Sequence, residues 1–145
     1  MDKIPVKKLR PNAVLPTYGT ASSAGADLYA CLENPVTIAP GCTVMIPTGL
    51  SMEIPVGYAG LIYARSGLSV KRGLAPANKV GVIDSDYRGE FMVALYNHGG
   101  SAQTVENGER IAQLVITPVF TPGFAEVETL SDTERGAGGF GSTGK

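Results

Sequence analysis

Two carboxylates and a tyrosine lie within one short segment, residues 81–90, with the sequence GVIDSDYRGE. An apolar pair leads into a turn-like Asp-Ser-Asp, and a second apolar run begins at Glu90. This pattern predicts a β-hairpin whose mouth carries Asp84 and Tyr87, a rigid place to mount a general base. Asp84 and Asp86 could instead cap the turn by accepting hydrogen bonds from its backbone N–H groups, and composition alone favours that interpretation.

A second segment, residues 64–68, has the composition of an anion-binding turn. An apolar run ends there, and Arg65, Ser66 and Gly67 open a short helix that we predict over residues 66–71. Free N–H groups at the start of a helix bind anions, and an arginine adds a two-pronged donor. A Ser66 N-cap beside a solvated Arg65 explains the same residues equally well.

The segment 135–145 holds five glycines and a single large apolar residue, Phe140. Its glycines match a dinucleotide-binding pattern, but that fingerprint needs a strand before it and a helix after it, which the sequence does not predict here. Glycine backbone can still approach an anion closely. Arg135 and Ser142 would add a cation and a hydroxyl, and Phe140 could cover an aromatic ring. The alternative is a mobile tail without a role.

Two weaker candidates are single polar residues among apolar neighbours. Asp27 is the one carboxylate in residues 24–28, and Gln113 lies inside an apolar run, where a buried amide needs hydrogen-bond partners. Either residue fits an ordinary structural role as well as a functional one. A zinc site of the usual four-ligand kind is excluded, because the chain has only two cysteines and one histidine.

Short β-type runs separated by turns must position these residues. Glycine and proline number 19 and 10 among the 145 residues, which predicts many turns and few long helices. A hydrophobic content of 43% against 17% charged residues argues against disorder. Residues rich in Val, Ile, Thr and Tyr predict strands at 4–9, 26–31, 36–38, 43–46, 50–54, 58–64, 80–83, 91–97, 103–105, 111–119 and 125–130.

These elements indicate an all-β fold, a sandwich or jelly roll of many short strands with one short helix. The runs 43–46 and 91–95 are too apolar for exposure on one side, so we expect both of their faces to be covered. Residues 1–134 would form one domain, and residues 135–145 a flexible Gly-rich C-terminal arm.

Charge and hydropathy limit the binding partners and the cellular compartment that we expect for this protein. The net charge is −1, without the basic stripe that a duplex-DNA binder usually shows, so we expect no nucleic-acid partner. Prolines and glycines interrupt the uncharged stretch 34–52, so we expect no membrane helix. The N-terminus lacks the apolar core of a signal peptide, and we therefore expect a cytoplasmic protein with reduced thiols.

Taken together and in this order, five segments closely resemble the five motifs of the all-β dUTP nucleotidohydrolases, the dUTPases. Five motifs in order are far more specific than any one of them. Ala64 is a departure, because many members have proline there. The segments are AGADL (24–28), ARSGL (64–68), GVIDSDYRGE (81–90), GERIAQLVI (108–116) and RGAGGFGSTG (135–144).

The resemblance implies a distorted jelly roll and a homotrimer with active sites at the subunit interfaces. It also implies hydrolysis of dUTP to dUMP and pyrophosphate with Mg2+, which would clear dUTP from the nucleotide pool and supply dUMP for dTMP synthesis. The arm 135–145 would close over the active site as a lid. Backbone groups of a hairpin could read the uracil edge and reject cytosine.

The resemblance also assigns roles to residues by motif position. Asp84 would activate the water that attacks the α-phosphorus, and Asp27 would act through water near the metal. Tyr87 would pack on the deoxyribose and exclude a 2′-hydroxyl, and Phe140 would stack over the uracil. The remaining uracil and deoxyribose contacts would come from Asn78, Gly81, Val82 and Ile83. The phosphates would be held by Arg65, Ser66, Gly67, Gln113, Arg135, Gly141 and Ser142.

Two alternatives stay open. One is a dCTP deaminase or a bifunctional deaminase–pyrophosphatase of similar fold, although no Glu is placed to deaminate cytosine. The other is a catalytically silent nucleotide-binding module on the same fold. Every reactive position of the motifs is filled, which argues against a silent module.

Overall fold

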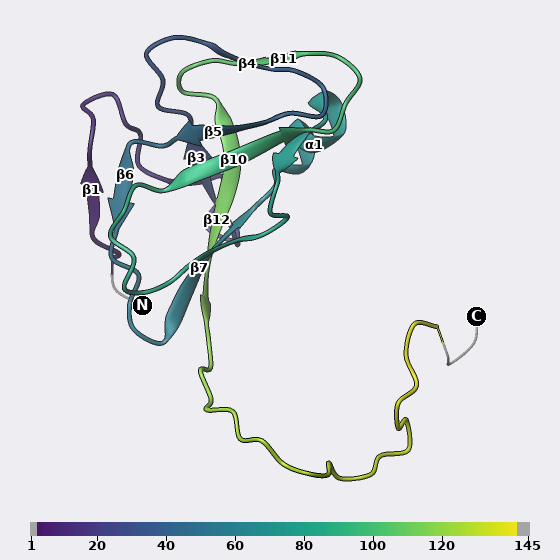
Figure 1. Cartoon of the computed structure of the whole chain (residues 1–145). Coiled ribbons are helices and arrows are strands. Elements are labelled where there is room, and N and C mark those ends of the chain that lie inside the picture. The colour runs from purple at the N-terminus through teal and green to yellow at the C-terminus, as the bar shows by residue number, and fades with distance from the viewer. Residues whose placement is uncertain (1–2, 142–145) are drawn as a thin grey trace.

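The computed structural model describes residues 3–141, and strands dominate it (Figure 1). The one helix among these residues is α1 (Ser66–Arg72). The strands, in chain order, are β1 (Val6–Lys8), β2 (Thr17–Tyr18), β3 (Ala26–Tyr29), β4 (Val36–Ile38), β5 (Thr43–Pro47), β6 (Leu50–Met52), β7 (Tyr58–Tyr63), β8 (Leu74–Pro76), β9 (Gly81–Ile83), β10 (Met92–Asn97), β11 (Gln103–Val105) and β12 (Arg110–Pro118). The predicted all-β class and the helix after residue 65 are confirmed.

All strand pairs within residues 3–141 are antiparallel, and they form four sheets. The largest has the order β2-β3-β12-β7-β9, and the second has the order β5-β10-β8. Two small sheets, β1-β6 and β11-β4, complete the body. In Figure 1, β10 crosses in front of β12, and β8 and β10 contact β12 across the interior. Apart from β2 and β3, the neighbours in each sheet are not consecutive along the chain, so the fold is built mainly from long-range pairings.

The core lies between these sheets and is made of aliphatic side chains around one aromatic ring. Phe91 is the largest fully buried side chain. Alternate residues of β10 point inward, so Val93 and Leu95 are buried while Met92 is exposed. The two cysteines are both free; Cys31 is buried in the core and Cys42 is exposed.

The structure corrects two expectations about strands and adds two strands that were not expected. Residues 81–83 and 91–97 do not form a hairpin, because β9 pairs with β7 whereas β10 pairs with β5 and β8. Residues 125–130 form no strand, since no other strand lies beside them. The sequence also gave no sign of β2 or β8, which are only two and three residues long.

The expectation that β5 and β10 are covered on both faces is wrong for the single chain. Met45 is 52% exposed and Met92 is 36% exposed. Their strands are neighbours, with Met45 opposite Ala94 and Met92 opposite Pro47. One face of this sheet therefore presents apolar side chains to solvent.

The chain leaves the body after β12. The Val119 N–H donates to the Gly57 carbonyl at 2.9 Å, and the residues beyond it curve away from the sheets (Figure 1). Phe120 and Phe124 are 96% and 100% exposed. We call residues 120–141 the tail. No helix among the described residues is long and apolar enough to cross a membrane.

Gly49, in the turn between β5 and β6, has both a positive φ of 69° and no room for a side chain. A Cβ there would lie 2.8 Å from Ala13 Cβ and 2.8 Å from Cys31 Sγ. We expect Gly49→Ala to lower the free energy of unfolding by roughly 2–5 kcal/mol, from left-handed strain plus overpacking. Denaturant unfolding at fixed protein concentration measures this change.

Gly41 is the matched control. Its φ is 72°, but a Cβ would meet no atom within 4 Å. Gly41→Ala should therefore lose only the strain component, roughly 1–2 kcal/mol. Equal losses in the two variants would contradict the role given to packing at Gly49.

Candidate functional site

Three of the singled-out segments meet at one end of the largest sheet. β12 lies between β3 and β7, and Gln113 is directly opposite Asp27 on one side and Tyr63 on the other. β7 ends at Tyr63, and the chain continues through Arg65 into α1. Strand pairing therefore places Asp27, Gln113 and Arg65 close together, although Asp27 and Gln113 are 86 positions apart in the sequence.

These residues line a cleft of about 380 Å³. Its walls come from the loop before β3, from β3 and β12, and from the start of α1. The lining residues are Gly19, Ser23, Ala24, Gly25, Asp27, Arg65, Ser66, Gly67, Arg110 and Gln113. Of the residues expected to bind phosphates, Arg65, Ser66, Gly67 and Gln113 are brought together here.

Two arginines surround the single carboxylate of this cleft. Arg65 Nε donates to Asp27 Oδ1 at 2.6 Å, and Arg110 Nη1 lies 3.4 Å from Asp27 Oδ2. Asp27 thereby orients both guanidinium groups but neutralises only one of their two charges. The remaining positive charge suits an anion, and the planar donors of arginine match phosphate oxygens.

Gln113 is held in place from two directions. Its Nε2 donates to the Ala64 carbonyl at 2.9 Å, which ties β12 to the residue before the α1 turn. On the other side it packs against Gly25, where a Cβ would collide with Gln113 Oε1 and lie 3.1 Å from Cδ. The amide fits only because Gly25 has no side chain.

The start of α1 leaves backbone donors free of side-chain caps. Arg65 is the N-cap residue, with φ −89° and ψ 128°, and no side chain caps the first turn. The suggested Ser66 N-cap is therefore wrong. Ser66 and Gly67 are exposed at the mouth of the cleft, and the first turn carries no acidic residue.

A second group of singled-out residues lies around β9. Gly81 and Ile83 are opposite Ile62 and Gly60 of β7, while Val82 is 62% exposed on the outer face. Before β9, the Val80 N–H donates to the Asn78 carbonyl at 2.7 Å across Lys79, whose φ is 66°. This tight turn places the exposed Asn78 beside Gly81, where a Cβ would lie 3.3 Å from Asn78 Nδ2.

Asp84 and Tyr87 follow β9 on an exposed turn. The Tyr87 N–H donates to the Asp84 carbonyl at 3.2 Å. The Tyr87 hydroxyl donates to the Glu90 carbonyl at 3.0 Å, and its ring centroid lies 6.1 Å from that of Phe91. Within residues 3–141 the carboxylates of Asp84 and Asp86 accept no hydrogen bond, so the capping interpretation has no support.

We call Asn78, Gly81, Val82, Ile83, Asp84 and Tyr87 the β9 group. Within one chain, the β9 group and the cleft are separate. Ile83 is opposite Gly60, three residues from the Tyr63 that faces Gln113, which is roughly 10 Å along the strand. None of the residues 78–87 lines the cleft. A single chain therefore does not bring Asp84 to the arginines.

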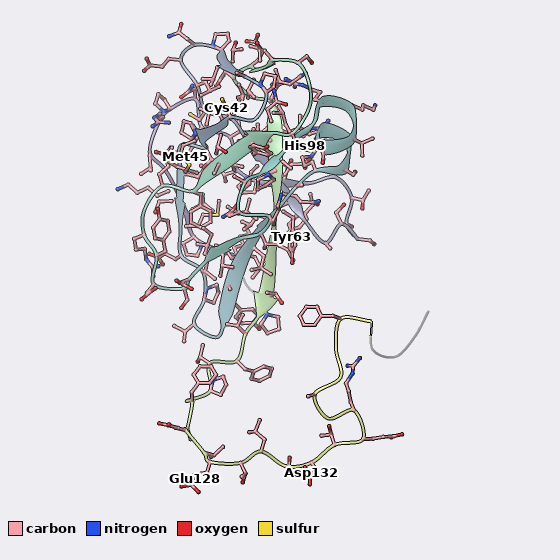
Figure 2. All side chains as sticks on the ribbon, turned by 45° about the vertical axis from the view of Figure 1, so that its right-hand side comes forward. Cys42, Met45, Tyr63, His98, Glu128 and Asp132 are labelled. Atoms are coloured by element: carbon pink, nitrogen blue, oxygen red, sulfur yellow. The ribbon has the colours of Figure 1, made fainter. Side chains whose placement is uncertain are left out.

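The tail also lies apart from the cleft. Figure 2 shows Glu128 and Asp132 on the loop that hangs below the body, away from Tyr63. Arg135 and Phe140 are exposed, and Gly141 has a φ of 89°. Ser142 is outside the described residues.

Comparisons with known proteins show which family the chain belongs to. A family model described as dUTPase matches residues 11–144. The chain is 51% identical over 143 residues to the deoxyuridine 5'-triphosphate nucleotidohydrolase of Hahella chejuensis, covering 98% of this chain and 94% of that protein. It is also 51% identical to the protein of that name from Janthinobacterium sp., covering 100% and 99%.

The chain belongs to the dUTPase family. Its fold also matches a structure of the Staphylococcus bacteriophage 80alpha dUTPase with dUPNHPP, with a TM-score of 0.91, 32% identity and full coverage of both chains. The predicted jelly-roll-like architecture and the resemblance stated from the five segments are thereby confirmed.

The cleft includes residues that the sequence did not single out, above all Arg110. Strict alternation along a strand would put Arg110 and Gln113 on opposite faces. The register shifts between Arg110 and Ala112, so a β-bulge turns Arg110 to the face of Gln113 and Asp27. Ser23 and Gly19 were also missed, because their loop reaches the cleft only through the pairing of β2 with β3.

The close packing of Gly25 against Gln113 generates a prediction. We expect Gly25→Ala to displace the amide and weaken the binding of inorganic triphosphate about fivefold, equivalent to roughly 1 kcal/mol of hydrogen bonding. Isothermal titration calorimetry measures this affinity. Gly100→Ala is the control, since a Cβ there meets nothing within 4 Å and lies outside the cleft. Equal affinities in the two variants would contradict the role of Gln113.

Proposed function

We propose that this protein hydrolyses dUTP to dUMP and pyrophosphate, which would clear dUTP from the nucleotide pool and supply dUMP for dTMP synthesis. The observation that carries the proposal is the cleft, in which three dUTPase segments bring Arg65, Arg110 and Gln113 together around Asp27. A triphosphate has several negative charges, and this cleft has a surplus of cationic donors. Relatives that are about half identical over nearly the whole chain carry the name of this activity.

We propose Mg2+ as the metal, held mainly by the substrate. Among residues 3–141, no group of three His, Cys, Asp or Glu side chains could hold a metal ion. Asp27 already bonds to two arginines, so it would contribute through water. A single carboxylate that acts through water fits Mg2+, because this ion keeps several water ligands and is commonly bound through substrate phosphates. Bound Mg2+ would neutralise charge on the phosphates during an in-line displacement.

Asp84 is the proposed general base. Its carboxylate is exposed and has no hydrogen-bond donor among the described residues, so it is free to orient a water molecule. The tight turns on both sides of β9 fix where it projects. Positioning of the water near the α-phosphorus would be the main contribution of Asp84.

The β9 group is the proposed nucleoside site. The exposed Val82 and the turn at Asn78 border the outer edge of β9, whose backbone groups on that side have no strand partner among the described residues. Those groups, with Gly81 and Ile83, would read the fixed donors and acceptors of uracil. Tyr87, anchored through its hydroxyl, would pack on the deoxyribose and leave no room for a 2′-hydroxyl.

We propose a homotrimer in which each active site combines groups from different subunits. The separation of Asp84 from the cleft within one chain supports this assembly. The exposed apolar face of β5-β10-β8, with Met45 and Met92, offers a surface for subunit contact. Closed symmetric association is the common way to bury such a face.

The C-terminal arm would complete the site. We propose that residues 135–145 fold over bound nucleotide, with Phe140 on the uracil. Arg135, Gly141 and Ser142 would bind the γ-phosphate end. The tail has no core of its own, and Phe140 is fully exposed, so a bound ligand is what would order it.

The proposed activity is tested by measuring pyrophosphate release from dUTP, dCTP, dTTP and UTP with Mg2+. We expect a strong preference for dUTP. No preference would refute the proposal, and ammonia release from dCTP would favour the deaminase alternative. Binding of dUTP without turnover would favour a silent nucleotide-binding module.

Replacement of the proposed base should separate binding from chemistry. We expect Asp84→Asn to keep dUTP affinity while turnover falls by roughly 10²–10⁴-fold, the usual contribution of a general base. Asp86→Asn is the matched control, because Asp86 is an exposed carboxylate on the same turn. Calorimetry and pyrophosphate release measure the two properties. Loss of turnover in Asp86→Asn rather than Asp84→Asn would move the base to Asp86.

Mixing inactive subunits tests the shared site. Asp84→Asn and Arg65→Ala should each be inactive alone, since one lacks the base and the other a phosphate ligand. If one subunit supplies Asp84 and another Arg65, equal mixing with subunit exchange should restore activity in about a quarter of the sites. Light scattering would establish the trimer. No recovery in a mixture shown to exchange subunits would contradict the shared site.

A further inference from the structure

The segment that carries Asp84 and Tyr87 is fastened to the body by the Glu90 side chain. Glu90 Oε1 accepts a hydrogen bond from the Gly49 N–H at 2.8 Å and lies 3.1 Å from Arg10 Nη1. Arg10 Nη2 donates to Glu90 Oε2 at 3.3 Å. The Glu90 side chain is 20% exposed, so both carboxylate oxygens are used in a partly buried setting. Glu90 thus ties residues 84–91 to two distant parts of the chain.

The Gly49 N–H depends on this carboxylate. Gly49 is buried in a left-handed turn, and Glu90 is the acceptor that its N–H has in the structure. Because a buried donor without a partner is destabilising, loss of the carboxylate would drive the Gly49 turn and residue 90 apart. Arg10 reinforces the link, because it also donates to the Cys31 carbonyl at 3.4 Å.

The backbone of Glu90 in turn sets the position of Tyr87. The Tyr87 hydroxyl donates to the Glu90 carbonyl, and its ring lies across Gly89, where a Cβ would be 2.8 Å from Tyr87 Cε2. The neighbouring Phe91 is fully buried, with its N–H bonded to the Leu50 carbonyl at 2.8 Å. The tyrosine ring is therefore built on the backbone of residues 89–91.

We propose that the Arg10–Glu90 pair is a positioning element that fixes Tyr87 and thereby sets the discrimination between deoxyribonucleotide and ribonucleotide. The inference rests on the proposed function, in which Tyr87 packs on the sugar. Arg10 and Glu90 act through Tyr87 and touch no substrate. Asp84 is at the far end of the turn and joins Tyr87 through one backbone hydrogen bond of 3.2 Å, so hydrolysis itself should depend less on the pair.

Other bonds keep the segment attached when the pair is removed. Ser51 Oγ donates to the Arg88 carbonyl at 2.8 Å, and Thr48 Oγ1 donates to the Phe91 carbonyl at 2.6 Å. Variants of Glu90 should therefore fold with a displaced Tyr87 rather than lose the segment.

The test compares kcat and KM for dUTP and UTP in Glu90→Ala, Glu90→Gln and Arg10→Met. We expect Glu90→Ala to lower the dUTP/UTP ratio of kcat/KM on the order of 10- to 100-fold, with a smaller change in kcat for dUTP. Glu90→Gln keeps an acceptor for the Gly49 N–H and should restore part of the ratio. Arg10→Met should cause a smaller loss, because the Gly49 bond remains.

The matched control is Glu109→Gln. Glu109 pairs with Arg72 at 2.7 Å with similar exposure, but it joins α1 to the start of β12 and does not contact residues 84–91. Its ratio should equal that of the wild type. The proposal is overturned if folded Glu90→Ala keeps the wild-type ratio, or if Glu109→Gln lowers it equally. Should Glu90→Ala not fold, Glu90→Gln and Arg10→Met decide by the same criterion. A wild-type protein without preference for dUTP would refute the proposed function instead.

Discussion

The cleft depends on the position of β12 between β3 and β7. The two registers of this strand put Gln113 opposite both Asp27 and Tyr63, and its bulge turns Arg110 toward the same side. Three segments that are distant in the sequence therefore meet without any loop having to reach across the molecule. Arg110 and Gln113 are mounted on a paired strand, where backbone hydrogen bonds fix them more firmly than a loop could, and Arg65 lies two residues beyond the end of β7. A slip of one residue would turn the polar side chains inward, so the same register serves both the core and the cleft.

The charge balance of the cleft follows from that geometry. Asp27 holds Arg65 on one oxygen and Arg110 on the other, so two guanidinium groups are oriented before any anion arrives. Without Asp27 the two cations would repel each other, and with a second carboxylate the cleft would lose its positive charge. One carboxylate shared by two arginines is thus a compromise between a stable unliganded site and attraction for a phosphorylated ligand.

Local patterns in the sequence predicted most strands and the helix, because alternating apolar and β-branched residues record burial directly. They failed where pairing is decided by distant segments. Apolar residues around the 84–90 turn suggested a hairpin, yet β9 completes the large sheet beside β7. Arg110 was missed because a bulge has no reliable local signature. Asp27, Arg65 and Gln113 could be singled out by residue type and by resemblance, but their convergence needed the strand order.

Two of the wrong expectations err in the same direction, because both predicted that more side chains are buried than a single chain buries. The apolar faces of β5 and β10 were expected to be covered, and residues 125–130 were expected to pair as a strand. Instead Met45 and Met92 face solvent, and the tail carries exposed Phe120, Phe124 and Leu130. A sequence records every environment in which its side chains are buried, whereas a single chain shows only its own contacts. In the proposed homotrimer, contact between subunits would cover these surfaces and would also bring Asp84 to a cleft that its own chain keeps at a distance.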